Sequence, residues 1–130
     1  MHLRDLKPTG DYVMVLDDDD VLTDDTVIEQ LAQICAERRP QVAIMQMDLC
    51  GRVLPDEWPP RHDHIAVSCW AVANHVWQAH ALDFGARYAG DYDFISAVLG
   101  CAAKHDVWHT SIVVARADRI GHGAPYGVAA

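Results

Sequence analysis

The stretch that decides the fold is Val13-Met14-Val15-Leu16-Asp17-Asp18-Asp19-Asp20, in which an apolar run ends abruptly in four consecutive carboxylates. A continuous apolar run predicts a strand that is buried on both faces, as in a parallel sheet. Four adjacent acids repel one another, and a fold gains little from placing them at the tip of a strand. A divalent cation that also contacts a phosphorylated ligand would relieve this repulsion, so the stretch predicts a binding site.

The residues after the acidic run predict a helix and a second strand. Thr23 or Thr26 is expected to cap the helix, and Thr26 and Glu29 have the spacing of a capping box. Apolar residues then recur at helical spacing until Pro40 ends the helix, and residues 42–47 predict the second strand. A strand–helix–strand unit implies a right-handed crossover, so the expected fold class is α/β with a mainly parallel sheet.

The remainder of the chain predicts further elements of the same domain. Because 130 residues is an ordinary size for one compact domain, we expect a single domain over residues 1–130. A proline-rich loop over residues 51–64 carries Trp58, whose ring is suited to stacking on the face of a sugar. The other expected elements are a strand at 65–72, a short helix around 74–81, a helix opened by Gly90 and Asp91, and a strand at 107–115.

The composition excludes several classes of partner. The net charge is −9 with only ten Lys and Arg residues and no basic stripe, which argues against binding to nucleic acid. No stretch approaches the roughly 20 apolar residues of a membrane span, and the N-terminus lacks the apolar centre of a signal peptide. The four cysteines are not spaced as a zinc or thioredoxin-like motif, so we expect reduced thiols and a cytoplasmic protein.

The acidic run is expected at the carboxyl end of its strand, where α/β sheets bind their ligands. In an extended chain, Asp17 and Asp19 would share one face while Asp18 points elsewhere. Hard carboxylate oxygens suit Mn²⁺ or Mg²⁺, and such ions commonly bind one or two carboxylates together with substrate phosphates. The alternative is a solvated acidic loop that also caps the following helix.

The stretch from Gly10-Asp11-Tyr12 to Asp25 resembles the central motif of family 2 glycosyltransferases, which have the GT-A fold. The resemblance implies a three-layer sandwich in which the acidic tip holds a divalent metal and the diphosphate of a nucleotide sugar. By position, Asp17 resembles the acid near the nucleotide, Asp19 the metal ligand and Asp20 the acid near the donor sugar. The run of four acids leaves the register ambiguous by one residue, so Asp18 belongs to the same candidate set.

A second acidic segment, Gly90-Asp91-Tyr92-Asp93, is similar to the acceptor-side segment of the same family. A sugar hydroxyl must lose a proton as it attacks the anomeric carbon, and a fixed carboxylate can accept that proton. The resemblance implies that Asp91 is this general base, with Asp93 as the reserve candidate, while plain helix capping by Asp91 is the alternative. His122, in the late glycine-rich segment, occupies a place where some relatives supply a metal ligand.

The resemblance implies an enzyme that transfers a sugar from a nucleotide-sugar donor to a hydroxyl acceptor, with inversion. Complete GT-A enzymes carry a further N-terminal portion, so we expect a fragment, a truncated gene product, or a reduced descendant that borrows its missing half from a partner or a dimer mate. One alternative is a haloacid-dehalogenase-type phosphatase with Asp17 as nucleophile and Asp19 as general acid; Lys7 and Lys104 do not fit that family's lysine. The other is a non-catalytic remnant that keeps the fold or the binding site.

Overall fold

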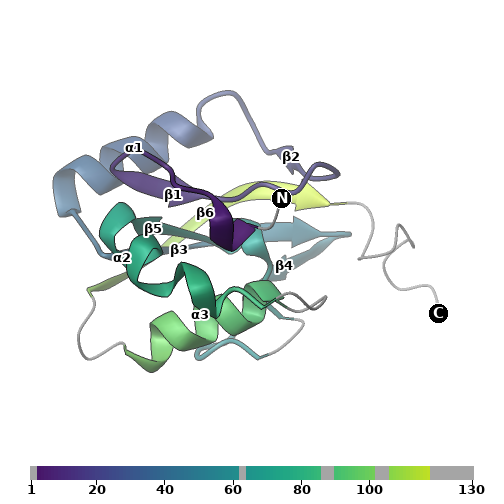
Figure 1. Ribbon diagram of the computed structural model, residues 1–130. Helices are drawn as coiled ribbons and strands as arrows, with labels where there is room; N and C mark the ends of the chain where they lie inside the picture. The colour runs from purple at the N-terminus through teal and green to yellow at the C-terminus, as the bar shows by residue number, and fades with distance from the viewer. Residues whose placement is uncertain (1–2, 62–63, 86–89, 102–105, 118–130) are drawn as a thin grey trace.

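The computed structural model describes residues 3–61, 64–85, 90–101 and 106–117, and it contains one six-stranded sheet with helices on both faces (Figure 1). The helices are α1 (Val27–Arg38), α2 (Asn74–His80) and α3 (Gly90–Gly100). Short 3-10 turns are η1 (Leu3–Asp5), η2 (Val67–Cys69) and η3 (Ala81–Asp83). The strands are β1 (Tyr12–Met14), β2 (Val21–Leu22), β3 (Val42–Leu49), β4 (Arg52–Leu54), β5 (Trp70–Ala73) and β6 (Val107–Ala117).

The sheet is mixed, so the expectation of a mainly parallel sheet is wrong. The strand order is β1-β5-β3-β6-β2, with β4 also paired to β3. Only β3 and β6 run parallel, and the other described pairings are antiparallel. The predicted β1–α1–β3 unit exists, but β5 occupies the place between β1 and β3. Because β5 runs opposite to both neighbours, it converts an expected parallel core into antiparallel ladders.

A tight hairpin that the sequence does not signal explains part of this topology. Cys50 and Gly51 connect β3 to β4 with φ values of 54° and 91°. Positive φ at both central residues is the backbone of a type I′ turn, whose twist matches that of the flanking strands. The Gly51 N–H also donates to Asp48 Oδ1 at 2.7 Å. The segment predicted as loop over 51–64 therefore begins with an antiparallel strand.

The two faces of the sheet carry separate apolar clusters. Helix α1 covers one face, where Val27 and Leu31 pack against Ala43, Met45 and Val114. Helices α2 and α3 cover the other face, as Figure 1 shows. The larger cluster lies on that side, and its fully buried members include Val42, Trp70, Trp77, Phe94, Ile95 and Val98. Burial on both faces explains why β3 is apolar without alternation.

The N-terminal end of α1 differs in detail from the expected capping box. Thr26 is the N-cap residue, but its side chain does not bond to the backbone of the first turn. Instead, Asp24 Oδ1 accepts from the Thr26 N–H and Oγ1–H, both at 2.7 Å, and Gln30 donates to Thr26 Oγ1 at 2.8 Å. Asp24 therefore accepts the Thr26 N–H, which the capping box would have paired with the side chain of Glu29.

Residues 15–20 connect β1 and β2, which lie at opposite ends of the strand order. Four strand spacings of about 4.8 Å would separate them by about 19 Å in a flat sheet. The connecting segment also doubles back, because the Asp20 N–H donates to the Asp17 carbonyl at 3.1 Å. The sheet is curled, which brings its two margins close enough for this short connection (Figure 1).

Both ends of that connection are held. Beyond it, the Thr23 N–H donates to the Val114 carbonyl at 3.1 Å, so the chain stays on β6. Before it, the Asn74 N–H donates to the Asp11 carbonyl at 2.8 Å, and Asn74 Nδ2 donates to Pro8 O at 2.8 Å. Within the described residues, no helix is long and apolar enough to cross a bilayer.

Candidate functional site

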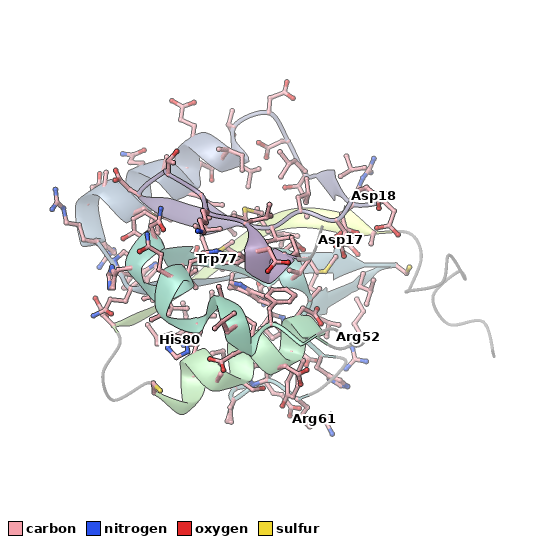
Figure 2. All side chains as sticks on the ribbon, in the orientation of Figure 1. Asp17, Asp18, Arg52, Arg61, Trp77 and His80 are labelled. Atoms are coloured by element: carbon pink, nitrogen blue, oxygen red, sulfur yellow. The ribbon has the colours of Figure 1, made fainter. Side chains whose placement is uncertain are left out.

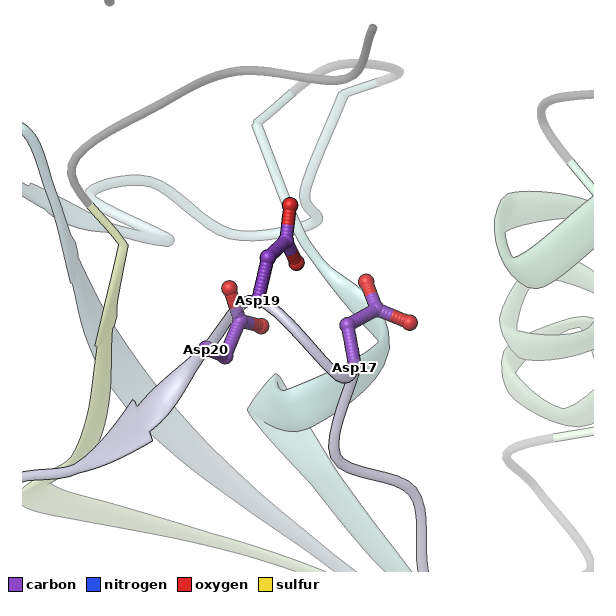
Figure 3. Close-up of side chains that lie close together, drawn as sticks. All are labelled: Asp17, Asp19 and Asp20. Carbon is purple, nitrogen blue, oxygen red and sulfur yellow. The ribbon is translucent and has the colours of Figure 1, made fainter. Parts of the chain in front are cut away.

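The acidic run forms a turn between β1 and β2 rather than an extension of β1. Figure 2 places Asp17 and Asp18 on this turn, and Figure 3 shows three of the carboxylates grouped together. One carboxylate oxygen from each of Asp17, Asp19 and Asp20 lies within 4.8 Å of the other two. The backbone reversal at Asp17 and Asp20 brings these side chains together, whereas strand alternation would have separated Asp20 from Asp19.

The electrostatics of the turn reflect this crowding. Partial burial, followed by the charges of Asp17, Asp19 and Asp18, raises the pKa of Asp20 to about 6. Loss of hydration among neighbouring protein atoms, followed by the charges of Asp19 and Asp91, raises the pKa of Asp17, although this side chain is open to solvent. Nearby like charges disfavour the ionised form of each carboxyl. The turn is therefore a place where positive charge would bind favourably.

Asp91 stands in the first turn of α3 and is half-buried. Its Oδ1 accepts the Tyr92 N–H at 2.9 Å. The start of this helix is fixed by a glycine pair, because a Cβ at Gly90 would overlap the carbonyl oxygen of Gly85. A residue with a side chain at position 90 would therefore prevent the two backbones from approaching so closely, whereas a Cβ at Gly85 would meet the carboxylate of Asp93. This contact sets where the helix begins and therefore where the Asp91 carboxylate stands.

The acidic turn and the first turn of α3 lie close enough for their charges to affect the same groups. The charge of Asp91 contributes to the raised pKa of Asp17. Burial raises the pKa of the Cys69 thiol to about 12, and the charges of Asp20 and Asp91 add to this effect. Cys69 is fully buried at the end of η2, just before β5. The acidic turn and the beginning of α3 thus lie near the same end of β5, although they are far apart in sequence.

The remaining candidates divide by position. Asp18 is exposed and lies outside the group of three carboxylates. Asp93, the reserve base, is half-buried in the first turn of α3, and its carboxylate lies beside Gly85. Trp58 is 45% exposed, on the segment that follows β4. His122 lies outside the described residues, so the structure gives no information on its expected role as a metal ligand.

The donor set of the acidic turn fits a hard divalent cation. All three grouped side chains offer carboxylate oxygens, which are the ligands that Mg²⁺ and Mn²⁺ prefer. Partial burial, followed by the charges of the neighbouring carboxylates, raises the pKa of Asp20, and a bound cation would offset this cost of ionisation. Asp19 lies between Asp17 and Asp20 in sequence, and its carboxylate belongs to the same group.

Two features of the site region escape sequence reasoning. The Gly85–Gly90 contact was not predicted, because nothing in the sequence signals that two glycines five positions apart will touch. No motif in the sequence marks His109, yet its ring meets Trp58 edge to face with centroids 4.1 Å apart. Neither contact follows from local periodicity, since each depends on how distant segments pack.

Comparison with known proteins identifies the family. The profile of glycosyl transferase family 2 matches residues 7–103, which include the acidic turn and Asp91 but not His122. Neither the curated proteins nor the solved structures gave a match. The family match favours the glycosyltransferase interpretation over a phosphatase, and this family implies a GT-A-like fold. Because the matched segment covers well over half of the chain, the protein belongs to glycosyl transferase family 2.

Proposed function

We propose that the chain binds a nucleotide-sugar donor at the acidic turn and transfers its sugar, with inversion, to a hydroxyl acceptor. The observation that carries this proposal is the grouping of Asp17, Asp19 and Asp20 on one turn within the segment that matches the family. A bound Mn²⁺ or Mg²⁺ would supply positive charge that neutralises a diphosphate leaving group. Family membership supports the donor class, and the geometry of the turn supports the cation.

The chain's own residues divide the work as follows. Asp19 would hold the cation, Asp17 would lie next to the nucleotide and Asp20 next to the donor sugar. Asp18, which lies outside the group, would contribute negative charge rather than a direct ligand. His122 is an additional candidate ligand.

Asp91 would accept the proton of the acceptor hydroxyl. Its position in the first turn of α3 suits this role, because the positive end of the helix dipole favours an ionised carboxylate. The oxygen that loses its proton to Asp91 forms the new bond to the anomeric carbon, while the bond from that carbon to the diphosphate breaks. Attack from the side opposite to the diphosphate inverts the configuration of the sugar.

Binding of the donor tests the first half of the proposal. Asp19→Ala should abolish Mn²⁺-dependent binding of UDP-glucose and GDP-mannose in isothermal titration calorimetry, because the group loses one of its three carboxylates. Asp25→Ala is the matched control, since Asp25 is an exposed acid of the same segment outside the group. Equal donor affinity in the Asp19→Ala and Asp25→Ala proteins would contradict the assignment.

Transfer tests the second half. Asp91→Asn should leave donor affinity unchanged and lower the rate of transfer by about 10²–10⁴-fold, the usual contribution of a general base. The measurement is the formation of product from a labelled donor, and NMR of the new glycosidic bond reports its configuration. Asp93→Asn should retain most of the activity; the reverse pattern would move the role of base to Asp93. Donor binding without turnover in the unmodified chain would indicate a binding remnant instead of an enzyme.

A further inference from the structure

A second candidate site lies on the sheet, apart from the acidic turn. A groove of about 390 Å³ is lined by Ile44 and Gln46 of β3, Pro55–Trp58 of the segment after β4, and His109–Ser111 of β6. Small-molecule sites typically measure about 300–1,000 Å³, so the groove is large enough for a small ligand. On β6, Arg116 pairs with Val21, which lies next to the acidic turn. Arg116 comes five residues after Ser111 of the groove, and five residues of extended strand span at most about 16 Å.

The geometry of the sheet explains why a groove exists here. The β3–β6 ladder passes from Ile44 opposite His109 to Gln46 opposite Val113, so β6 carries extra residues at this point. A bulge of this kind turns side chains away from the regular alternation of a strand. Thr110 and Ser111 belong to the bulged segment and line the groove. Gln46 Nε2 donates to Pro55 O at 3.2 Å, which holds the segment after β4 over β3.

An indole ring that is both held and open forms one wall of the groove. The rings of Trp58 and His109 meet edge to face at an interplanar angle of 89°, so the imidazole supports one side of the indole. Nevertheless 45% of Trp58 remains exposed. Large aromatic side chains are usually covered, so an ordered and exposed indole beside polar groups is suited to stacking on a ligand.

The charges around the groove favour a neutral ligand. Asp56 pairs with Arg52 at 3.2 Å, and Glu57 pairs with Arg61, so both carboxylates of the lining are balanced by arginines (Figure 2 labels both arginines). Partial burial lowers the pKa of His109, which keeps its ring uncharged at neutral pH. The other polar groups of the lining are the amide of Gln46 and the hydroxyls of Thr110 and Ser111. Among the residues that the structure describes, no Lys or Arg side chain lines the groove to attract a phosphate.

We infer that this groove is a binding site for a neutral saccharide of one or two sugar rings. A sugar ring presents an apolar C–H face and a rim of hydroxyls, which match the Trp58 indole and the neutral polar groups of β3 and β6. The inference rests on the proposed function only where it identifies this saccharide as part of the acceptor. None of the grouped carboxylates of the acidic turn lines the groove, so the groove is a different place from the one where the donor diphosphate would bind.

The test uses the full chain in EDTA, without any nucleotide sugar, so that its result is independent of the acidic turn. Cellobiose, maltose, lactose and diacetylchitobiose are titrated into ¹⁵N-labelled protein. At least one should shift the Trp58 indole N–H signal in a saturable manner, while glucose 6-phosphate should not. No shift with any of the four sugars, or stronger binding of uridine at the same signal, would overturn the inference.

Substitutions locate the binding. Trp58→Ala should weaken the affinity at least about tenfold, read from other groove signals, because the stacking surface is lost. Trp58→Phe and Thr110→Val should cause smaller losses, and they keep the test informative if Trp58→Ala does not fold. Leu82→Ala is the control, since Leu82 is 79% exposed and lies outside the groove. Equal losses in Trp58→Ala and Leu82→Ala would refute the site.

The same titration separates this inference from the proposed function. The Asp19→Ala protein should keep its affinity for the saccharide while losing the Mn²⁺-dependent binding of donor. Saccharide binding without any donor binding in the unmodified chain would support the groove and contradict the transferase proposal. Saccharide-induced shifts confined to the acidic turn would contradict the groove instead.

Discussion

At the scale of single residues, Asp20 shows how the acidic turn affects stability. Its pKa of about 6 in the folded protein exceeds the ordinary value of 3.8, so the folded chain binds this proton more tightly than the unfolded chain does. Between these two values, stability falls as the pH rises, and above about pH 6 the full cost of ionising this partly buried carboxyl beside its acidic neighbours is present. At neutral pH the turn is therefore a source of instability in the metal-free protein.

Asp20→Asn should consequently stabilise the metal-free protein at pH 7.5. We expect a gain of about 1 kcal/mol in the free energy of unfolding, after allowance for solvent screening. The gain should shrink as the pH falls through 6 and disappear below about pH 4, where the native carboxyl is protonated in both states. Urea denaturation in EDTA, at pH 7.5 and again below about pH 4, measures this gain in the free energy of unfolding. Asp25→Asn removes the same formal charge from outside the group, and a gain as large as that of Asp20→Asn would contradict the explanation.

At the scale of elements, the start of α3 depends on the contact between Gly85 and Gly90. Alanine is normally better than glycine inside a helix by about 1 kcal/mol. At position 90, however, the added Cβ would meet backbone rather than a flexible side chain, so the helix itself must move. Steric strain should outweigh helix propensity here.

Gly90→Ala should therefore destabilise the protein by about 1–3 kcal/mol, the usual cost of forced close contacts. The matched control is Gly100→Ala at the other end of the same helix, where an added Cβ would meet no atom within 4 Å. That variant should be neutral or slightly stabilised. Thermal unfolding of both variants measures the difference, and a Gly90→Ala protein as stable as Gly100→Ala would show that the contact is unimportant.

The same scale shows how much of the fold the sequence predicts. Periodicity and Pro40 predict α1, and the apolar runs predict β1, β3 and β6 close to their observed bounds. The strand order and the relative directions of the strands were not predictable, because a local apolar run does not specify which strand becomes its neighbour. The Cys50–Gly51 turn also carries no recognisable hairpin signal, since the expected Asn-Gly or Asp-Gly pair is absent.

At the scale of the whole molecule, Phe94 connects the elements that cover one face of the sheet. Its ring is fully buried. The ring centroid lies 6.0 Å from that of Trp70 on β5, 5.3 Å from that of Trp77 on α2 and 5.4 Å from that of Phe84. These rings unite α2, α3 and the sheet in one aromatic cluster. The position of Asp91, one turn before Phe94, depends on that packing.

Phe94→Ala should lower the free energy of unfolding by about 3–5 kcal/mol, the usual cost of removing a buried aromatic ring. This is a large part of the roughly 5–15 kcal/mol that stabilises a typical domain. Phe94→Leu fills more of the cavity and should cost less. Urea denaturation measures both variants, and a loss below about 1 kcal/mol for Phe94→Ala would mean that the cluster rearranges to fill the space.

The candidate site was predictable only where it is local. The four consecutive acids predict the group of carboxylates directly, because the residues that gather there are neighbours in the chain. The proximity of Asp91 to that turn depends on the packing of α3, and the Trp58–His109 groove depends on a bulge in β6. Tertiary packing of this kind leaves no mark in the spacing of single residues.

The linker at residues 15–20 has a consequence for how the protein can vary. It joins the two outermost strands of a curled sheet, and hydrogen bonds attach the chain on either side of it. Its length and the curvature of the sheet therefore determine each other. An insertion or deletion between β1 and β2 would alter the shape of the whole sheet rather than one loop, and substitutions that flatten a distant strand would change the spacing of the carboxylates.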